Sequence, residues 1–231
     1  MKRNAGILAD RAIGELFHEG RLKSEAALDA DQIQPASLDL RLGSKALRVR
    51  ASFMPGPNHT VADKLERLTL HEIDLEQGAV LETGCVYIVP LMESLDLPAD
   101  LSASTNPKSS TGRLDIFTRV MVDRAQEFDK IPAGYAGQLY LEISPRTFPV
   151  IVRRGSRLSQ IRFRTGQALL SEAEVLSLHD AQTLVASETP NVSGGGIALS
   201  IDLKGTGPEG LIGYRGKHHT SVIDVDQKAA H

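Results

Sequence analysis

Apolar and polar residues alternate over short stretches through most of this chain. Ser37–Leu42 alternates strictly between the two kinds, which is typical of a strand with one buried face. Near the N-terminus the spacing is helical instead: Asp10 precedes Ile13 and Leu16, and Gly20 follows them. This arrangement predicts a short amphipathic helix with an N-cap residue and a C-terminal glycine. The pattern therefore predicts one short helix followed by many short strands.

Gly, Pro or Asp residues bound most of the alternating stretches. Val61–Leu70 fits either a brief helix or an extended segment. The remaining strands are predicted at Lys45–Arg50, Ala79–Glu82, Val86–Leu91, Ile116–Val122, Gln138–Ser144, Pro149–Arg153 and Leu158–Arg164. With 20 glycines, 11 prolines and no long helical periodicity, this pattern favours a mainly β barrel or sandwich over a parallel α/β fold.

The last forty residues differ from the rest. Ser187–Gly196 is polar and rich in glycine, and the pattern of Ala198–Gly205 repeats that of Ala36–Gly43. We therefore predict a folded domain over residues 1–186, and over residues 187–231 a hinge followed by either a C-terminal arm or the start of a second repeat. The sequence favours neither alternative.

Composition limits the classes of function. The net charge of −3 provides no general attraction for a polyanion, so we expect no nucleic-acid partner. Cys85 is the only cysteine, which excludes an intrachain disulfide and any zinc site that needs two thiolates. No stretch reaches the roughly 18 apolar residues of a membrane span, and no apolar stretch of signal-peptide length follows Met1. These features predict a cytoplasmic protein without a membrane partner.

The densest group of polar residues is Asn106–Arg113. Lys108 and Arg113 flank three hydroxyl residues and Gly112, a combination that suits a triphosphate because it offers charged donors, hydroxyl donors and a close backbone approach. It is not a P-loop, since the GxxxxGK[ST] pattern is missing. The alternative interpretation is a solvated polar turn.

Glu142 lies in the middle of the strand predicted at Gln138–Ser144. Side chains alternate along a strand, so Glu142 shares one face with Tyr140 and Ser144, while the apolar residues occupy the other. On an open sheet this carboxylate would be inert. If its face lines a pocket, partial desolvation makes Glu142 a usable proton shuttle near neutral pH.

Taken in order, these segments resemble the motifs of the dCTP deaminase family. The resemblance is carried by Asp10–Ile13 with Gly20–Leu22, Pro35–Gly43, Lys108–Arg113, Gly134–Gly137 with Leu141–Glu142, and Ser156–Phe163. It implies a dUTPase-like β-clip fold, a distorted jelly-roll barrel with a short N-terminal helix, assembled as a homotrimer with active sites between subunits. It also implies hydrolysis of dCTP to dUTP and ammonia, with Mg²⁺ carried by the triphosphate and dTTP as an inhibitor.

The same resemblance implies roles for individual residues. Glu142 matches the catalytic glutamate, and Ser109 and Arg113 match active-site residues. The implied substrate-binding residues are Lys108, Ser109, Ser110, Thr111, Gly112, Arg113, Tyr140, Leu141 and Gln160. Zinc deaminases need H-x-E and P-C-x-x-C motifs, which this chain lacks, so we expect no protein-bound metal.

One departure from the family pattern bears on the alternatives. The family's Ile-Asp-Pro-Gly becomes Ile131–Gly134 without an aspartate, and Asp123 or Asp129 are the candidates to replace it. A dUTP diphosphatase, or an enzyme that performs both reactions, needs an aspartate to position water at the α-phosphate, so its absence counts against both. A module that binds deoxynucleotides without turnover is the third alternative; a carboxylate facing a polyanion counts against it.

Overall fold

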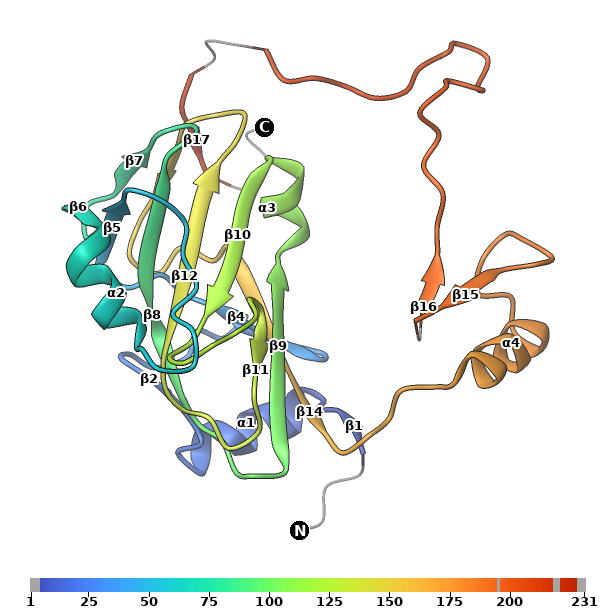
Figure 1. The fold of residues 1–231 in the computed structure, drawn as a ribbon, viewed down its shortest axis with the longest axis horizontal. Helices are drawn as coiled ribbons and strands as arrows, with labels where there is room; N and C mark the ends of the chain where they lie inside the picture. Colours follow the sequence, from blue (N-terminus) through green and yellow to red (C-terminus); the bar gives the residue numbers. More distant parts are fainter. Residues whose placement is uncertain (1–4, 195, 218–220, 228–231) are drawn as a thin grey trace. The chain divides into compact units, whose positions relative to one another are not determined.

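The computed structural model describes residues 5–194, 196–217 and 221–227, and the chain divides into two units (Figure 1). Unit 1 comprises residues 1–166 together with 217–231, and unit 2 comprises residues 167–216. None of the helices in the described part of the chain is long and apolar enough to cross a membrane.

Unit 1 is built from three β-sheets. Sheet A has the order β11-β9-β14-β4-β3, with β1 paired to β14. Its strands are β1 (Gly6–Ile7), β3 (Ile33–Gln34), β4 (Ser37–Leu40), β9 (Leu101–Pro107), β11 (Lys130–Ile131) and β14 (Ser159–Thr165). Sheet B has the order β10-β12-β8-β5-β6, with β2 paired to β8. Its strands are β2 (Leu22–Ser24), β5 (Lys45–Val49), β6 (Thr69–Asp74), β8 (Val86–Asp96), β10 (Ile116–Met121) and β12 (Ala136–Pro145). The third sheet contains β7 (Ala79–Leu81), β13 (Val150–Val152) and β17 (Ile223–Asp224).

Sheets A and B contribute their inner faces to one hydrophobic core. Leu38 and Phe163 from sheet A and Leu91 and Leu141 from sheet B are all fully buried in it. Most of the core residues are Leu, Ile and Val, which agrees with the absence of tryptophan in the sequence. This core fixes which side chains of each strand face outwards.

The outer face of sheet B carries a second, smaller apolar cluster. Helix α2 (Val61–Leu68) places Val61 and Leu65, one helical turn apart, against Val49, Ile88 and Met121 of the sheet. The sequence left this segment open between helix and strand. Thr60 stabilises the helical conformation by capping its N-terminus. Its hydroxyl accepts from the Asp63 amide at 3.1 Å, and the Asp63 carboxylate accepts from the Thr60 amide at 2.7 Å, which is a reciprocal cap.

Most of the predicted elements are confirmed, and several further elements were not predicted. The N-terminal helix is α1 (Asp10–His18). Strand β9 was not predicted, because Leu101, Ala103 and Thr105 face inwards but only the first is strongly apolar. The polar segment after β9 forms a single helical turn, α3 (Ser109–Arg113), where only a turn was expected.

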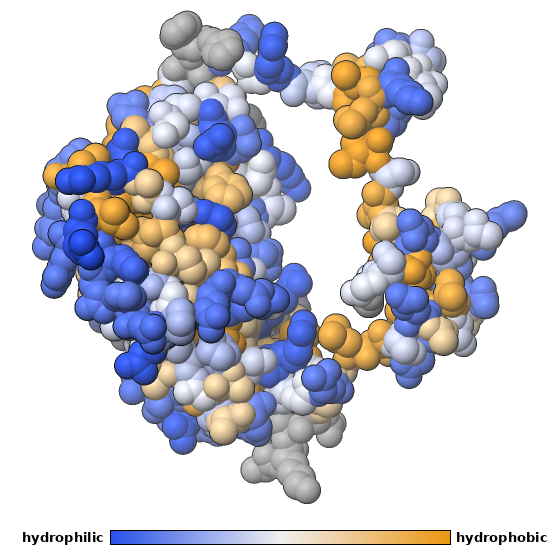
Figure 2. Space-filling model, viewed as in Figure 1, coloured by the Kyte–Doolittle hydropathy of each residue, from blue (hydrophilic) through white to orange (hydrophobic). Residues whose placement is uncertain are grey.

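Unit 2 contains α4 (Glu172–Ala181) and the hairpin of β15 (Asn191–Ser193) and β16 (Gly196–Ala198), none of which was predicted. Apolar side chains lie open along it (Figure 2), among them Leu199, Ile201 and Leu203. These three lie in the segment whose pattern repeats that of Ala36–Gly43. In the shared Ser-x-Asp-Leu pattern, Ile201 and Leu203 correspond to Leu38 and Leu40 of β4, which are fully buried. The domain boundary after residue 186 and both interpretations of the C-terminal segment stay predictions.

Candidate active site

Helix α3 holds the predicted phosphate-binding residues at the end of β9. Thr111 is buried, and its hydroxyl donates to the Leu158 carbonyl at 2.8 Å. The Lys108 amide donates to the same carbonyl at 3.0 Å. Thr111 therefore anchors the turn from inside, whereas Lys108, Ser110 and Arg113 reach the surface of a cavity.

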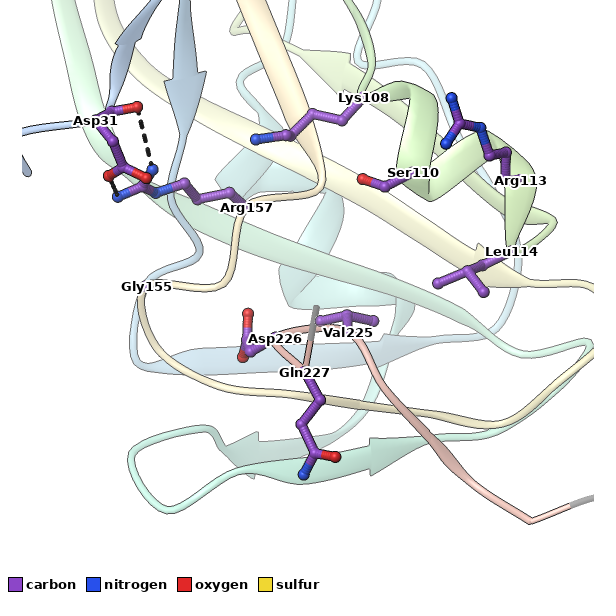
Figure 3. A pocket seen from close by; sticks show the side chains of 10 residues that line it. All are labelled: Asp31, Lys108, Ser110, Arg113, Leu114, Gly155, Arg157, Val225, Asp226 and Gln227. Carbon is purple, nitrogen blue, oxygen red and sulfur yellow. Dashed lines mark hydrogen bonds and ion pairs between the residues drawn. The ribbon is translucent and has the colours of Figure 1, made fainter. Parts of the chain in front are cut away.

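This cavity has a volume of about 670 Å³. Figure 3 shows Lys108 and Arg157 at one side of it and Arg113 with Leu114 at the other. The lining residues are Asp31, Lys108, Ser110, Arg113, Leu114, Gly155, Arg157, Val225, Asp226 and Gln227. The space and the cations at its rim suit a phosphorylated ligand.

Two of the three cations at the cavity are already paired with carboxylates. Lys108 forms an ion pair with the buried Asp39, and Arg157 contacts Asp29 at 2.5 Å and Asp31 at 2.8 Å. Arg113 makes no ion pair with any described residue. A bound phosphate could therefore use Arg113 without displacing a protein carboxylate.

A C-terminal strap, Ile223–Gln227, forms one wall of this cavity. Strand β17 runs parallel to β13, and Arg153 donates to both carboxylate oxygens of Asp224 at 2.7 Å. The Ser156 hydroxyl donates to Asp226 at 2.6 Å. The hydrogen bonds from Arg153 hold the pKa of Asp224 below its ordinary value.

Replacing Arg153 by alanine should loosen the strap, because the Asp224 carboxylate loses a bidentate, charge-assisted partner. We expect the free energy of unfolding in urea to fall, and the Val225 amide, which donates to the Ile151 carbonyl, to exchange hydrogen faster. Arg154→Ala is the matched control, since its ion pairs are longer, at 3.6 and 3.7 Å, and should cost under about 0.5 kcal/mol.

The stabilisation that the Arg153–Asp224 pair provides should be lost only towards low pH. Because the folded-state pKa of Asp224 lies below its ordinary value of 3.8, the stabilisation is fully present above that pH and is lost as the pH falls through the folded-state pKa. The difference between the unchanged protein and Arg153→Ala should therefore shrink below pH 3.8. An equal difference at all pH values would contradict the role given to this pair.

Glu142 lies on the outer face of sheet B, as the alternation predicts. It pairs in register with Arg119 of β10 and Ile88 of β8, and it is only 1% exposed. Tyr140 and Ser144 share its face, whereas Leu141 points into the core. The carboxylate is thus withdrawn from water.

Among the described residues, partners are found for only one oxygen of this carboxylate. Arg119 donates to Glu142 Oε1 from Nη2 at 2.6 Å and from Nε at 3.2 Å. Glu142 Oε2 is buried and has no hydrogen-bond partner among the described residues. A buried polar atom without a partner is costly, and here it leaves one lone-pair-bearing oxygen free for a ligand.

The predicted site residues form two groups within one chain. Lys108, Ser110 and Arg113 line the cavity, while Tyr140 and Glu142 do not. Gln160 lies on β14 and accepts from the Ser37 hydroxyl at 2.9 Å. Ser109 and Gly112 belong to α3 but do not line the cavity.

The sequence did not point to Arg119, which contacts the carboxylate, or to Asp39, which pairs with Lys108. Arg119 is the one charged residue in Ile116–Met121, and that is the only signal that could have found it. No group of three or more His, Cys, Asp or Glu side chains within the described ranges is arranged to hold a metal ion.

The fold and the two groups of residues define a mainly β protein with a cation-lined cavity at α3 and, outside that cavity, a buried carboxylate on sheet B. The family model for the N-terminal domain of 2'-deoxycytidine 5'-triphosphate deaminase matches residues 4–167, and the model for its C-terminal domain matches residues 171–231. The chain belongs to the dCTP deaminase family, which confirms the predicted resemblance. The structure confirms that the fold is mainly β.

Individual relatives agree with this assignment. A dCTP deaminase of Halorubrum lacusprofundi is 34% identical over 160 residues, covering 68% of this chain and 76% of the relative. A dUMP-forming dCTP deaminase of Dictyoglomus thermophilum is 32% identical over 159 residues, covering 68% and 79%. The crystal structure of the 2'-deoxycytidine 5'-triphosphate deaminase of Agrobacterium tumefaciens is 77% identical, with a TM-score of 0.89, and the match covers 99% of this chain and 68% of that one.

Proposed function

We propose that this protein hydrolyses dCTP to dUTP and ammonia, with Glu142 as the general base and acid. The observation that carries the proposal is the state of the Glu142 carboxylate. It is buried, one oxygen is bonded to Arg119, and the other has no partner among the described residues. Family membership supplies the substrate.

In the proposed reaction, Glu142 Oε2 removes a proton from a water molecule whose oxygen forms a bond to C4 of the cytosine ring. Glu142 returns that proton to N3 or to the leaving amino group. The C4 hydroxyl proton moves, again through Glu142, to whichever of these two nitrogens has not yet received one. The bond between C4 and the amino nitrogen breaks, ammonia leaves, and the C4 carbonyl and the protonated N3 of dUTP remain. Proton transfer of this kind contributes about 10²–10⁴-fold to a rate.

The proposal needs no zinc-bound water. Zinc deaminases bind the metal through a histidine and two cysteines, or through three cysteines, and this chain has one cysteine and no H-x-E motif. Mg²⁺ enters as part of the substrate, bound to the triphosphate. The developing charge at the ring is stabilised by polar groups of the site.

We further propose a homotrimer in which each active site lies between two subunits. Within one chain, the cavity at α3 is not lined by Glu142, so the cations and the carboxylate belong to separate surfaces. The face that carries Glu142 also presents Phe117, which is 47% exposed beside Arg119. The α3 turn of a neighbouring subunit would complete the site there.

A bifunctional enzyme is the second candidate, because the Dictyoglomus thermophilum relative is named dUMP-forming. The two aspartates that could position water are already engaged. Asp123 accepts from the Val61 amide at 2.7 Å, and Asp129 accepts from Thr105 at 2.7 Å and from Val120 at 2.8 Å. These hydrogen bonds favour deamination alone.

The test is to incubate the purified protein with dCTP and Mg²⁺ and to measure ammonia and pyrophosphate separately. We expect one ammonia per dCTP consumed and no pyrophosphate. Ammonia together with pyrophosphate would establish the bifunctional enzyme. Pyrophosphate without ammonia, or tight dCTP binding without any product, would overturn the deaminase proposal.

A further inference from the structure

Arg119 is held from several directions at once. Its guanidinium group donates twice to Glu142 Oε1 and once to the Ser52 hydroxyl at 2.8 Å. Its Cζ atom lies 3.6 Å from the centroid of the Phe128 ring and 4.9 Å from that of Phe117. A planar guanidinium stacked on an aromatic ring has little freedom to turn, so Arg119 offers Glu142 a fixed pair of donors.

Phe128 owes its position to the residue that follows it. Asp129 has a left-handed backbone, with φ of 61°, and its carboxylate accepts from the Val120 amide and the Thr105 hydroxyl. Its own amide donates to the Val120 carbonyl at 2.8 Å. The loop of residues 123–130 is therefore tied to β9 and β10, and this attachment sets the Phe128 ring against Arg119.

The charges around the site favour this arrangement. Asp129 is a second carboxylate close enough to interact with both Arg119 and Glu142, and burial raises its pKa, as does the Glu142 charge. Arg119 is the group that hydrogen-bonds Glu142. A single guanidinium thus orients one carboxylate and moderates the repulsion between two.

We propose that Arg119, stacked on Phe128, is a positioning residue for the deamination: it fixes Glu142 Oε1 so that Oε2 faces the attacking water. This inference rests on the proposed function of Glu142. Arg119 itself touches no reacting atom in this scheme. Its removal should therefore lower kcat and leave substrate binding almost unchanged, because a carboxylate that can rotate is misplaced for proton transfer.

Arg119→Gln should lower kcat for ammonia release by about 10²-fold, with KM and the calorimetric Kd for dCTP within about threefold. Arg119→Lys keeps the charge and one donor but loses the fork geometry, so it should recover kcat to within about tenfold of the unchanged protein. Phe128→Leu, which removes the stacking ring, should lower kcat by about threefold to tenfold.

Arg48→Gln is the matched control for these variants. Arg48 lies on β5 of the same sheet, its guanidinium is over the Tyr87 ring at 5.7 Å, and it donates to backbone carbonyls rather than to Glu142. The same substitution there should leave kcat within about twofold, because no proton-transfer group is touched. Thermal melts of all four variants show whether each is folded at the assay temperature.

The outcomes separate this inference from the function on which it rests. If the unchanged protein releases no ammonia from dCTP, both the function and the role of Arg119 are overturned. If it does, and Arg119→Gln has unchanged kcat, or loses only dCTP affinity, the positioning role alone is wrong. Equal losses in Arg119→Lys and Arg119→Gln that follow a lowered melting temperature would assign Arg119 to the fold and overturn the proposal.

Discussion

Replacing Glu142 by glutamine should abolish ammonia release from dCTP while dCTP still binds. The glutamine oxygen can accept the two hydrogen bonds from Arg119, so the local packing is kept, but an amide cannot take a proton from water. General base catalysis is worth about 10²–10⁴-fold, and we expect kcat to fall by at least that range. Single-turnover assays of ammonia, together with calorimetric titration of dCTP, measure the two effects separately.

Glu93 provides the matched control, because it is also a buried glutamate paired with an arginine. Its Oε1 accepts from Arg41 and Gln32, both at 2.9 Å, and its Oε2 accepts from the Arg41 amide at 2.8 Å. Both oxygens of Glu93 are therefore used by the protein, whereas Glu142 leaves Oε2 unused among the described residues.

This difference predicts opposite results for the two substitutions. Glu93→Gln removes the nearer charged partner of the buried Arg41 guanidinium and leaves it only the ion pair with Asp29 at 3.4 Å. It should therefore cost stability, about 1–3 kcal/mol, with kcat per folded molecule unchanged. Glu142→Gln should cost activity and little stability. If Glu142→Gln instead keeps normal turnover, or loses activity only by unfolding, its catalytic role is wrong.

Local sequence patterns were enough to predict most of the fold of unit 1. Alternation identified β4 and β12, because one side chain in two must enter the core, and the helical spacing after Asp10 identified α1. Strand β9 was not predicted, because alanine and threonine fill inward positions that usually carry larger apolar side chains. Helix α3 was not predicted, because its five residues are too few to show a helical period.

The Glu142 carboxylate and the cations at α3 could also be predicted from residue type. The partners of these groups could not. Glu142 and Arg119 are 23 residues apart and meet only through the register of β10 and β12. Phe128 reaches Arg119 through a loop with two left-handed residues, Arg124 and Asp129. The Arg153–Asp224 pair that docks the strap spans 71 residues. Each of these contacts depends on tertiary structure.

Arg113 is the residue through which an intersubunit site can be tested. It is the one cavity cation that makes no ion pair with a described residue, so a phosphate would be its main partner, and charge-assisted bonds to phosphate are strong. Arg113→Ala should lower kcat/KM by about 10²-fold. The protein should stay folded, because Arg113 forms no ion pair within the described ranges.

Mixing the inactive Glu142→Gln and Arg113→Ala subunits should then restore ammonia release. In a closed ring of identical contacts, a site built from Glu142 of one subunit and Arg113 of the next is intact when the first carries Arg113→Ala and the second carries Glu142→Gln. Random mixing of equal amounts makes roughly a quarter of the sites intact, far above either variant alone. A chain carrying both substitutions, mixed with either variant, provides the control, since at most one half of each site can then be supplied. If each active site lay within a single chain, no mixture of the two variants would recover activity.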